Sequence, residues 1–149
     1  MQRRTLIRAI LIAAFAVLGT SSSAFAQTGK VPPPAGKQGV VIQVSDDSPK
    51  TWNQALNVIR NIQAAYGMDK VDIELVAFGN GIGMLKADSV VANRIDDTLG
   101  AGTHVYACEN TMRGRKLQKD DMNPKISYVP AGIIEMIEKQ QSGWAVVRP

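Results

Sequence analysis

The chain has 149 residues, and its 17 Lys and Arg residues against 13 Asp and Glu residues give a formal net charge of +4. Three of the basic residues lie within the first 26 positions, which contain no acidic residue, so the rest of the chain is close to neutral, at about +1. That balance excludes the electrostatic pattern of a nucleic-acid-binding domain.

The first 26 residues have the form of a secretory signal peptide. Basic residues precede an apolar core from Ile10 to Leu18, and Ala24-Phe25-Ala26 matches a small-x-small cleavage site. The apolar core is shorter than the roughly 20 residues that a membrane-spanning helix needs. We therefore expect residues 1–26 to be cleaved during export, leaving a periplasmic protein with no membrane association.

Residues 27–38 follow the predicted cleavage site and include three consecutive prolines, Pro32 to Pro34. This composition is typical of an extended, flexible tether. The remaining residues, 39–149, have the length of one compact domain.

Strand and helix patterns alternate through residues 39–149. Strands are expected at short β-branched and apolar runs, namely residues 39–44, 71–78, 104–107, 126–129 and 144–147. The first helix is predicted between Ser48-Pro49 and Gly67, because apolar residues recur there every three or four positions. Later helices are expected from Val90 to Leu99, from about Thr111 to Leu117, and from Ile133 to near Gly143.

This alternation indicates an α/β fold with a mostly parallel five-stranded sheet and helices on both faces. In such open sheets, ligands and reactive groups gather beyond the carboxyl ends of the strands. Side chains just after the predicted strands are therefore the first candidates for a functional site.

Cys108 is the only cysteine of the chain and follows the third predicted strand. The backbone N–H groups of the next helix favour a thiolate there, as does positive charge from Arg113 and Arg115, whereas Glu109 acts in the opposite direction. A lone cysteine cannot form an internal disulfide. Two interpretations follow: Cys108 is a reactive thiol, or it is a small apolar residue packed at a strand end.

His104, the only histidine, is predicted on the same strand, four residues before Cys108. At about 3.3 Å per residue the two Cα atoms are roughly 13 Å apart, which excludes a direct Cys-His catalytic pair. One histidine and one cysteine also argue against a structural zinc site, so no metal is expected.

Two further groups of residues end predicted strands. The segment from Gly79 to Gly83 has the spacing G-x-G-x-G, which departs from the dinucleotide-binding fingerprint, so no cofactor is expected. Its glycines either allow the backbone to approach the Cys108 pocket or form an ordinary tight turn. Asp46 and Asp47 are interpreted as turn and capping residues.

Several of these segments together resemble one protein family. They are Asp47 to Asn53, Ala55 to Asn57, Ala77 to Gly81, Ala107 to Met112, and Gln141 to Ala145. In this combination the sequence is similar to the exported, single-domain branch of the DsrE/DsrF-like sulfur-relay proteins. The resemblance extends from about Gly39 to Pro149.

The resemblance implies a three-layer α/β/α sandwich around a five-stranded parallel sheet, assembled into homo-oligomers. In sulfur-relay relatives a cysteine at the end of the third strand carries sulfane sulfur as a persulfide, and Cys108 matches it by position. The expected partners are a sulfur donor or acceptor protein, or a small sulfur compound.

A pocket around Cys108 follows from this expectation. Asn110 and Thr111 would supply hydrogen bonds and Arg113 positive charge, and the loop with Asn80, Gly81 and Gly83 would form the opposite wall.

Three functions remain open from the sequence. The first is a periplasmic sulfur carrier or weak sulfurtransferase that uses Cys108. The second is a non-catalytic module that binds a small ligand or a subunit, in which Cys108 only packs. The third is a redox or copper-handling protein, with Cys108 and nearby Met84 or Met112 as soft ligands.

Overall fold

The computed structural model describes residues 36–149. The predicted signal peptide, residues 1–26, and the predicted tether up to residue 35 lie outside this part of the chain. The strands are β1 (Gln38–Val44), β2 (Val71–Ala77), β3 (His104–Cys108), β4 (Ser127–Val129) and β5 (Ala145–Val147). The helices are α1 (Pro49–Tyr66), α2 (Ala92–Gly100), α3 (Glu109–Gly114) and α4 (Gly132–Gln141), with 3₁₀ segments η1 (Met68–Lys70), η2 (Gly79–Leu85) and η3 (Lys119–Asp121).

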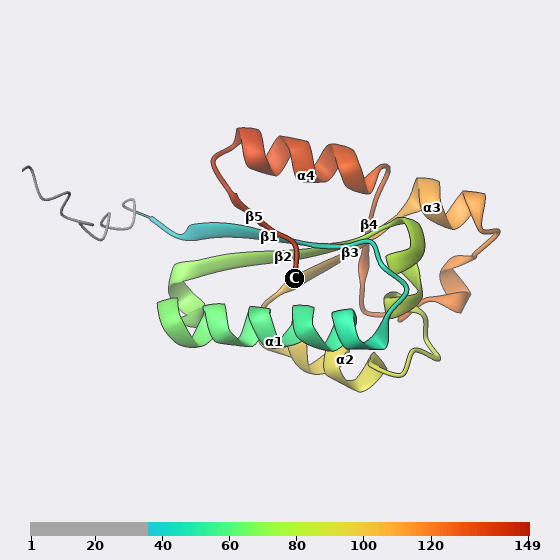
Figure 1. Cartoon of the computed structure of the whole chain (residues 1–149), viewed down its shortest axis with the longest axis horizontal. Coiled ribbons are helices and arrows are strands. Elements are labelled where there is room, and N and C mark those ends of the chain that lie inside the picture. The colour runs from blue at the N-terminus through green and yellow to red at the C-terminus, as the bar shows by residue number, and fades with distance from the viewer. Residues whose placement is uncertain (1–35) are drawn as a thin grey trace, which may run out of the picture. The chain divides into compact units, whose positions relative to one another are not determined.

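The five strands form one sheet in the order β4-β3-β2-β1-β5, and every pairing is parallel. Figure 1 shows α1 and α2 on one side of this sheet and α4 on the other, while α3 lies beyond the ends of β3 and β4. The predicted α/β fold, with a parallel five-stranded sheet between helical layers, is confirmed. Both edge strands have three residues.

The first helix shows why local sequence determines an element so clearly here. Ser48 precedes it in an extended conformation, and its hydroxyl accepts a hydrogen bond from the Thr51 N–H. Pro49 occupies the first turn, where its missing N–H is harmless. At the other end Gly67 has φ 91°, a conformation that favours glycine, and the helix ends there. The prediction for this helix is confirmed.

The two faces of the sheet differ greatly in their packing. Side chains alternate between faces along each strand. The face under α1 and α2 holds the large core, to which Ile42, Leu75 and Ala107 belong. On the α4 face the structure gathers only a small buried cluster of Val41, Val76, Val129 and Met136.

Helix α4 departs from an ordinary amphipathic pattern. Of the four apolar residues that mark it in the sequence, only Met136 is buried, while Ile133, Ile134 and Ile137 are all more than two-fifths exposed. A single helix over this face leaves room for one inward stripe, so the remaining isoleucines point outward.

Some element boundaries differ from the sequence predictions for local reasons. Helix α2 begins at Ala92 instead of Val90, because the Ser89 hydroxyl accepts a hydrogen bond from the Val91 N–H and forms a turn before it. Helix α3 covers Glu109–Gly114 and stops before Leu117, because Lys116 adopts φ 57° and turns the chain. Within residues 36–149, none of the helices has the length and apolar character needed to cross a bilayer.

Candidate functional site

Cys108 is the last residue of β3 and the N-cap of α3. Val105 and Ala107 on the same strand belong to the core under α1 and α2, whereas Tyr106 packs with the α4 cluster. Because side chains alternate along a strand, Cys108 points with Tyr106 toward the α4 side of the sheet. The thiol therefore lies between the carboxyl end of β3 and the beginning of α4.

Hydrogen-bond donors surround the Cys108 sulfur. The backbone N–H of Thr111 donates to Sγ at 3.4 Å. The Thr111 hydroxyl accepts a hydrogen bond of 3.0 Å from the Gly79 N–H, which leaves its own hydrogen for the sulfur. The backbone at Asn110 and Gly132 also favours the charged sulfur, while the Asn110 N–H donates its hydrogen bond to the Pro130 carbonyl at 3.2 Å. Gly132 is the first residue of α4 and closely follows Val129, which pairs with Cys108, so the beginning of a second helix lies near the thiol.

This environment shifts the acidity of the thiol. Burial alone would raise the pKa of Cys108, because a charged sulfur loses contact with water. The Thr111 hydroxyl and the N–H groups of Gly132, Thr111 and Asn110 act in the opposite direction and prevail, so the pKa lies below its ordinary value. A larger share of the sulfur is thus thiolate, the nucleophilic form.

The residue is at the same time deeply placed, with only 4% of its surface exposed. Its surroundings are polar, because N–H and O–H donors face the sulfur. A reactant can reach this sulfur only after neighbouring groups move aside. Burial and activation therefore coexist in this site.

Gly132 was not identified from the sequence, although its position makes the site possible. A Cβ atom there would lie 3.0 Å from Phe78 Cδ1 and 3.2 Å from Val76 Cγ1, closer than ordinary contacts. Only glycine lets the first turn of α4 sit against the end of β2 without displacing these side chains. The signal available in the sequence was a small residue, at the start of a helix, just after the fourth strand.

A model of the DsrE/DsrF-like family matches residues 38–149, three-quarters of the sequence and nearly all of its described part. The chain belongs to the DsrE/DsrF-like family. No curated protein matches it significantly.

Solved structures resemble this DsrE/DsrF-like chain throughout its described part. A protein of unknown function from Methanobacterium thermoautotrophicum has a TM-score of 0.73 and 28% identity, covering 76% of this chain and 100% of its own. A conserved protein of unknown function from Bacteroides thetaiotaomicron has a TM-score of 0.62 and 18% identity over 75% of this chain and 95% of its own. The ychN protein of E. coli has a TM-score of 0.61 and 11% identity over 76% of this chain and 99% of its own. The last two support the fold alone.

The structure of this DsrE/DsrF-like chain brings only part of the predicted pocket to the sulfur. Thr111 lies there with both its hydroxyl and its N–H, whereas Asn110 contributes its backbone. The Asn110 side chain instead accepts a hydrogen bond from the Arg113 guanidinium on the exposed surface of α3. Glu109 extends along the same outer surface, with a carboxylate oxygen 4.0 Å from Lys119 Nζ. Glu109 is not among the groups that shift the pKa of Cys108.

Asn80, Gly81 and Gly83 lie elsewhere than predicted. They belong to η2, whose apolar side chains pack in the core under α1 and α2, on the opposite face of the sheet from Cys108. Gly81 abuts the Val44 carbonyl, where a Cβ atom would come within 2.3 Å of the oxygen. The loop glycines thus permit close packing of η2 on the end of β1. The member of this segment that reaches the site is Gly79, through Thr111.

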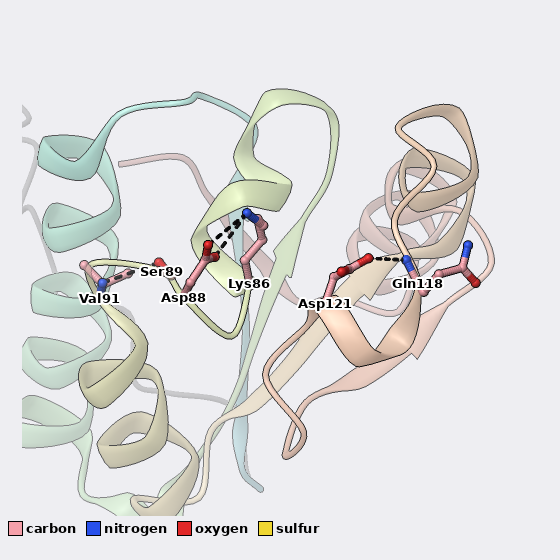
Figure 2. Close-up of polar contacts among 6 residues, drawn as sticks. All are labelled: Lys86, Asp88, Ser89, Val91, Gln118 and Asp121. Atoms are coloured by element: carbon pink, nitrogen blue, oxygen red, sulfur yellow. Dashed lines mark hydrogen bonds and ion pairs between the residues drawn. The ribbon is translucent and has the colours of Figure 1, made fainter.

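Asn80 and Gly83 instead line a separate cavity of about 430 Å³ near the start of α1. The Asn80 side chain accepts a hydrogen bond from Arg115. Figure 2 shows part of the rim, where Lys86 and Asp88 face one another between η2 and α2, at 3.1 Å. Both cations and carboxylates line this cavity, and no single ligand chemistry follows from them.

The remaining candidates are also separated from the thiol. His104 lies at the opposite end of β3 and stacks on Tyr106, with ring centroids 6.5 Å apart. Met84 and Met112 pack in the large core, on the other face of the sheet from the sulfur. In the part of the chain that the structure describes, no group of three or more His, Cys, Asp and Glu side chains could hold a metal ion.

Proposed function

We propose that this protein is a periplasmic sulfur carrier that holds sulfane sulfur as a persulfide on Cys108. The observation that carries the proposal is the position of Cys108 at the N-cap of α3, where the Thr111 N–H donates to Sγ at 3.4 Å and the pKa of the thiol is lowered. The association of the DsrE/DsrF-like family with sulfur relay supports it. The position beyond the carboxyl end of a central strand is where open α/β sheets place their chemistry.

The proposed loading step is a thiolate displacement. The Cys108 thiolate attacks the outer sulfur of a donor persulfide, R–S–SH, and a new S–S bond forms as the donor S–S bond breaks. The donor leaves as the thiolate R–S⁻, which takes the bonding electron pair, and Cys108 becomes Cys–S–SH. Delivery repeats the displacement with an acceptor thiolate attacking the outer sulfur. No external oxidant or reductant is required.

The residues around Cys108 fit the requirements of such a carrier. The same N–H and O–H donors that stabilise a thiolate can stabilise the negative charge of a persulfide. The sequence has no second cysteine that could displace the carried sulfur by forming an internal disulfide. Because only 4% of Cys108 is exposed, loading also requires the start of α4 or of α3 to move.

The cellular location is part of the proposal and rests on the signal-like first 26 residues. Expression of the full chain in a bacterium with a periplasm should yield a protein that begins at Gln27, recovered in the periplasmic fraction. An unprocessed protein in the cytoplasmic fraction would contradict this location.

The proposed partners are a sulfur donor, a sulfur acceptor and further copies of this chain. The outer face of α4 supports the last of these, because Ile133, Ile134 and Ile137 expose apolar surface beside one another. Light scattering should report an oligomer for the wild type and a smaller species for Ile137→Lys. A monomeric wild type at micromolar concentration would remove this part of the proposal.

The decisive experiment is sulfur loading followed by mass spectrometry of the intact protein. Incubation with a small persulfide or polysulfide donor should add one sulfur atom, which peptide analysis should locate on Cys108. The matched control is Cys108→Ser, which keeps the size of the side chain and should gain nothing. A Cys108→Ser protein that still gains sulfur, or a wild type that gains none, would refute the carrier function.

The burial of Cys108 favours one alternative, a non-catalytic module that binds a small ligand or a subunit. In that case the folded protein would resist alkylation at every pH below unfolding, and Cys108→Ala would still bind its partner. Alkylation of the folded protein with a midpoint below that of a free cysteine would exclude it.

A further inference from the structure

Helix α4 contacts the sheet through one narrow stripe of residues. Gly132 and Met136 are its buried members, and Lys139 follows three positions later on the same side. This spacing of four and three residues gives one contact per helical turn. The stripe begins near Cys108, because the chain reaches Gly132 shortly after Val129, which pairs with Cys108, and Pro130, whose carbonyl accepts from the Asn110 N–H. It ends at Lys139.

Lys139 makes the strongest polar contact of this stripe. Its Nζ lies 2.6 Å from Glu74 Oε1, and the Glu74 side chain on β2 is only 5% exposed. The ammonium also lies 3.6 Å from Glu135 and 4.4 Å above the ring of Trp144. Glu74 Oε2 is buried, and the described residues give it no hydrogen-bond partner. Lys139 is therefore the group that neutralises this carboxylate.

Such a contact restrains α4 more sharply than its apolar packing does. The cluster around Met136 is small, and its dispersion contacts have little directionality, so it restricts the orientation of α4 less than a polar contact does. The buried Glu74 carboxylate needs the Lys139 ammonium beside it, since an unpaired charge there is strongly unfavourable. The pair thus opposes both rotation of α4 and sliding of the helix along its axis. Seven residues away, at roughly 10 Å along the helix, the same rigid body carries the Gly132 N–H.

We propose that Glu74 and Lys139 are positioning residues for Cys108, which hold α4 in the orientation that points the Gly132 N–H at the sulfur and keeps the sulfur covered. The inference rests on the proposed role of Cys108 as the working thiol. Neither side chain touches the sulfur in this role.

The sign of one substitution separates positioning from simple electrostatics. Glu74→Gln removes a negative charge beside His104, roughly 13 Å along β3 from Cys108, and through Coulomb's law alone this would lower the alkylation midpoint or leave it unchanged. Loss of the α4 anchor withdraws a donor from the thiolate and would raise the midpoint. Lys139→Arg keeps the charge but replaces a compact ammonium with a longer, planar group, so it alters the geometry alone.

The experiment is the rate of alkylation by iodoacetamide as a function of pH, on the protein as it is isolated after expression of the full chain, with folding checked by circular dichroism. Glu74→Gln should raise the midpoint by about half a pH unit or more, and should raise the limiting rate at high pH because the sulfur is less covered. Lys139→Arg should raise the midpoint in the same direction. Glu74→Met combined with Lys139→Met replaces the ion pair with an apolar contact between α4 and β2, and should return the midpoint toward that of the wild type.

Asp72→Asn is the matched control, because it removes a carboxylate from the same strand in an exposed pair with Lys37. It should leave both the midpoint and the limiting rate unchanged. A lowered or unchanged midpoint in Glu74→Gln would overturn the inference. If Glu74→Gln fails to fold, an unchanged midpoint in Lys139→Arg would overturn it equally. Sulfur loading is not used in this measurement, so failure of the carrier function and failure of the positioning role give different results.

Discussion

The two faces of the sheet differ in the kinds of residue that they bury. Under α1 and α2 lies a large apolar core, in which residues such as Leu75 and Ile42 are fully buried. Under α4 lie a few apolar residues, a buried ion pair and the thiol. Buried polar groups tolerate little rearrangement. The polar site on the α4 face therefore depends on the apolar core under α1 and α2, which supplies most of the stability of the fold.

The largest effect is expected from a cavity in the core under α1 and α2. Leu75→Ala should lower the free energy of unfolding by about 2–5 kcal/mol, because the fully buried side chain leaves a void that the core only partly fills. Chemical denaturation would measure the loss. The alkylation midpoint of Cys108 should remain that of the wild type at temperatures where the variant is folded. A shifted midpoint would mean that the two faces are coupled.

A smaller and more local effect is expected from Thr111. Thr111→Val keeps the shape of the side chain but removes the hydroxyl that donates to Cys108 and accepts from the Gly79 N–H. Hydrogen bonds to charged groups contribute about 1.5–3 kcal/mol, so the midpoint should rise by about one unit or more.

Thr111→Ser retains the hydroxyl and is the control for this substitution. It should titrate close to the wild type in the same alkylation assay. Equal midpoints in the valine and serine variants would show that the hydroxyl does not stabilise the thiolate.

The lowered pKa of Cys108 also predicts a dependence of stability on pH. Since the folded-state pKa lies below the ordinary value of 9.0, the folded protein binds fewer protons than the unfolded chain between the two values. The resulting stabilisation is fully present above about pH 9 and disappears as the pH falls through the folded-state pKa. Urea unfolding of wild type and Cys108→Ser should therefore diverge with rising pH. A constant difference would contradict the shift.

The smallest effect is expected at Glu109, although it is the immediate neighbour of Cys108 in sequence. Its carboxylate lies along the outer surface of α3, 4.0 Å from Lys119, and is partly exposed, so solvent screens it. Glu109→Gln should move the alkylation midpoint by much less than Thr111→Val does. A comparable shift would show that the carboxylate acts on the thiol through space.

Sequence patterns predicted the fold well because its signals are local. Ser48, Pro49 and Gly67 bound α1 by their own conformational preferences. Cys108 was likewise found at a strand end before a helix, since both elements are encoded next to it.

The surroundings of the sulfur were less predictable, because they depend on how distant segments meet. Periodicity indicated that Gly79 to Gly83 follow β2, but not that η2 folds onto the α1 face and leaves only Gly79 in contact with Thr111. Gly132 is the first residue of α4 and follows β4 in the chain. Its position near Cys108 could be inferred only by knowing how α4 crosses over the sheet. Glu74 is invisible to pattern analysis, because it alternates with apolar residues just as the half-exposed Asp72 does on the same strand, and so looks like a solvent-facing residue.

The brevity of β4 and β5 has a consequence for how copies of this protein can associate. Long exposed edges recruit further strands and lead to aggregation, whereas an edge of three residues offers a foreign strand few backbone groups to pair with. Growth of the sheet into a fibril is therefore disfavoured at both sides. Association between molecules is thereby left to helix surfaces, where a self-complementary contact closes at a dimer instead of continuing without limit.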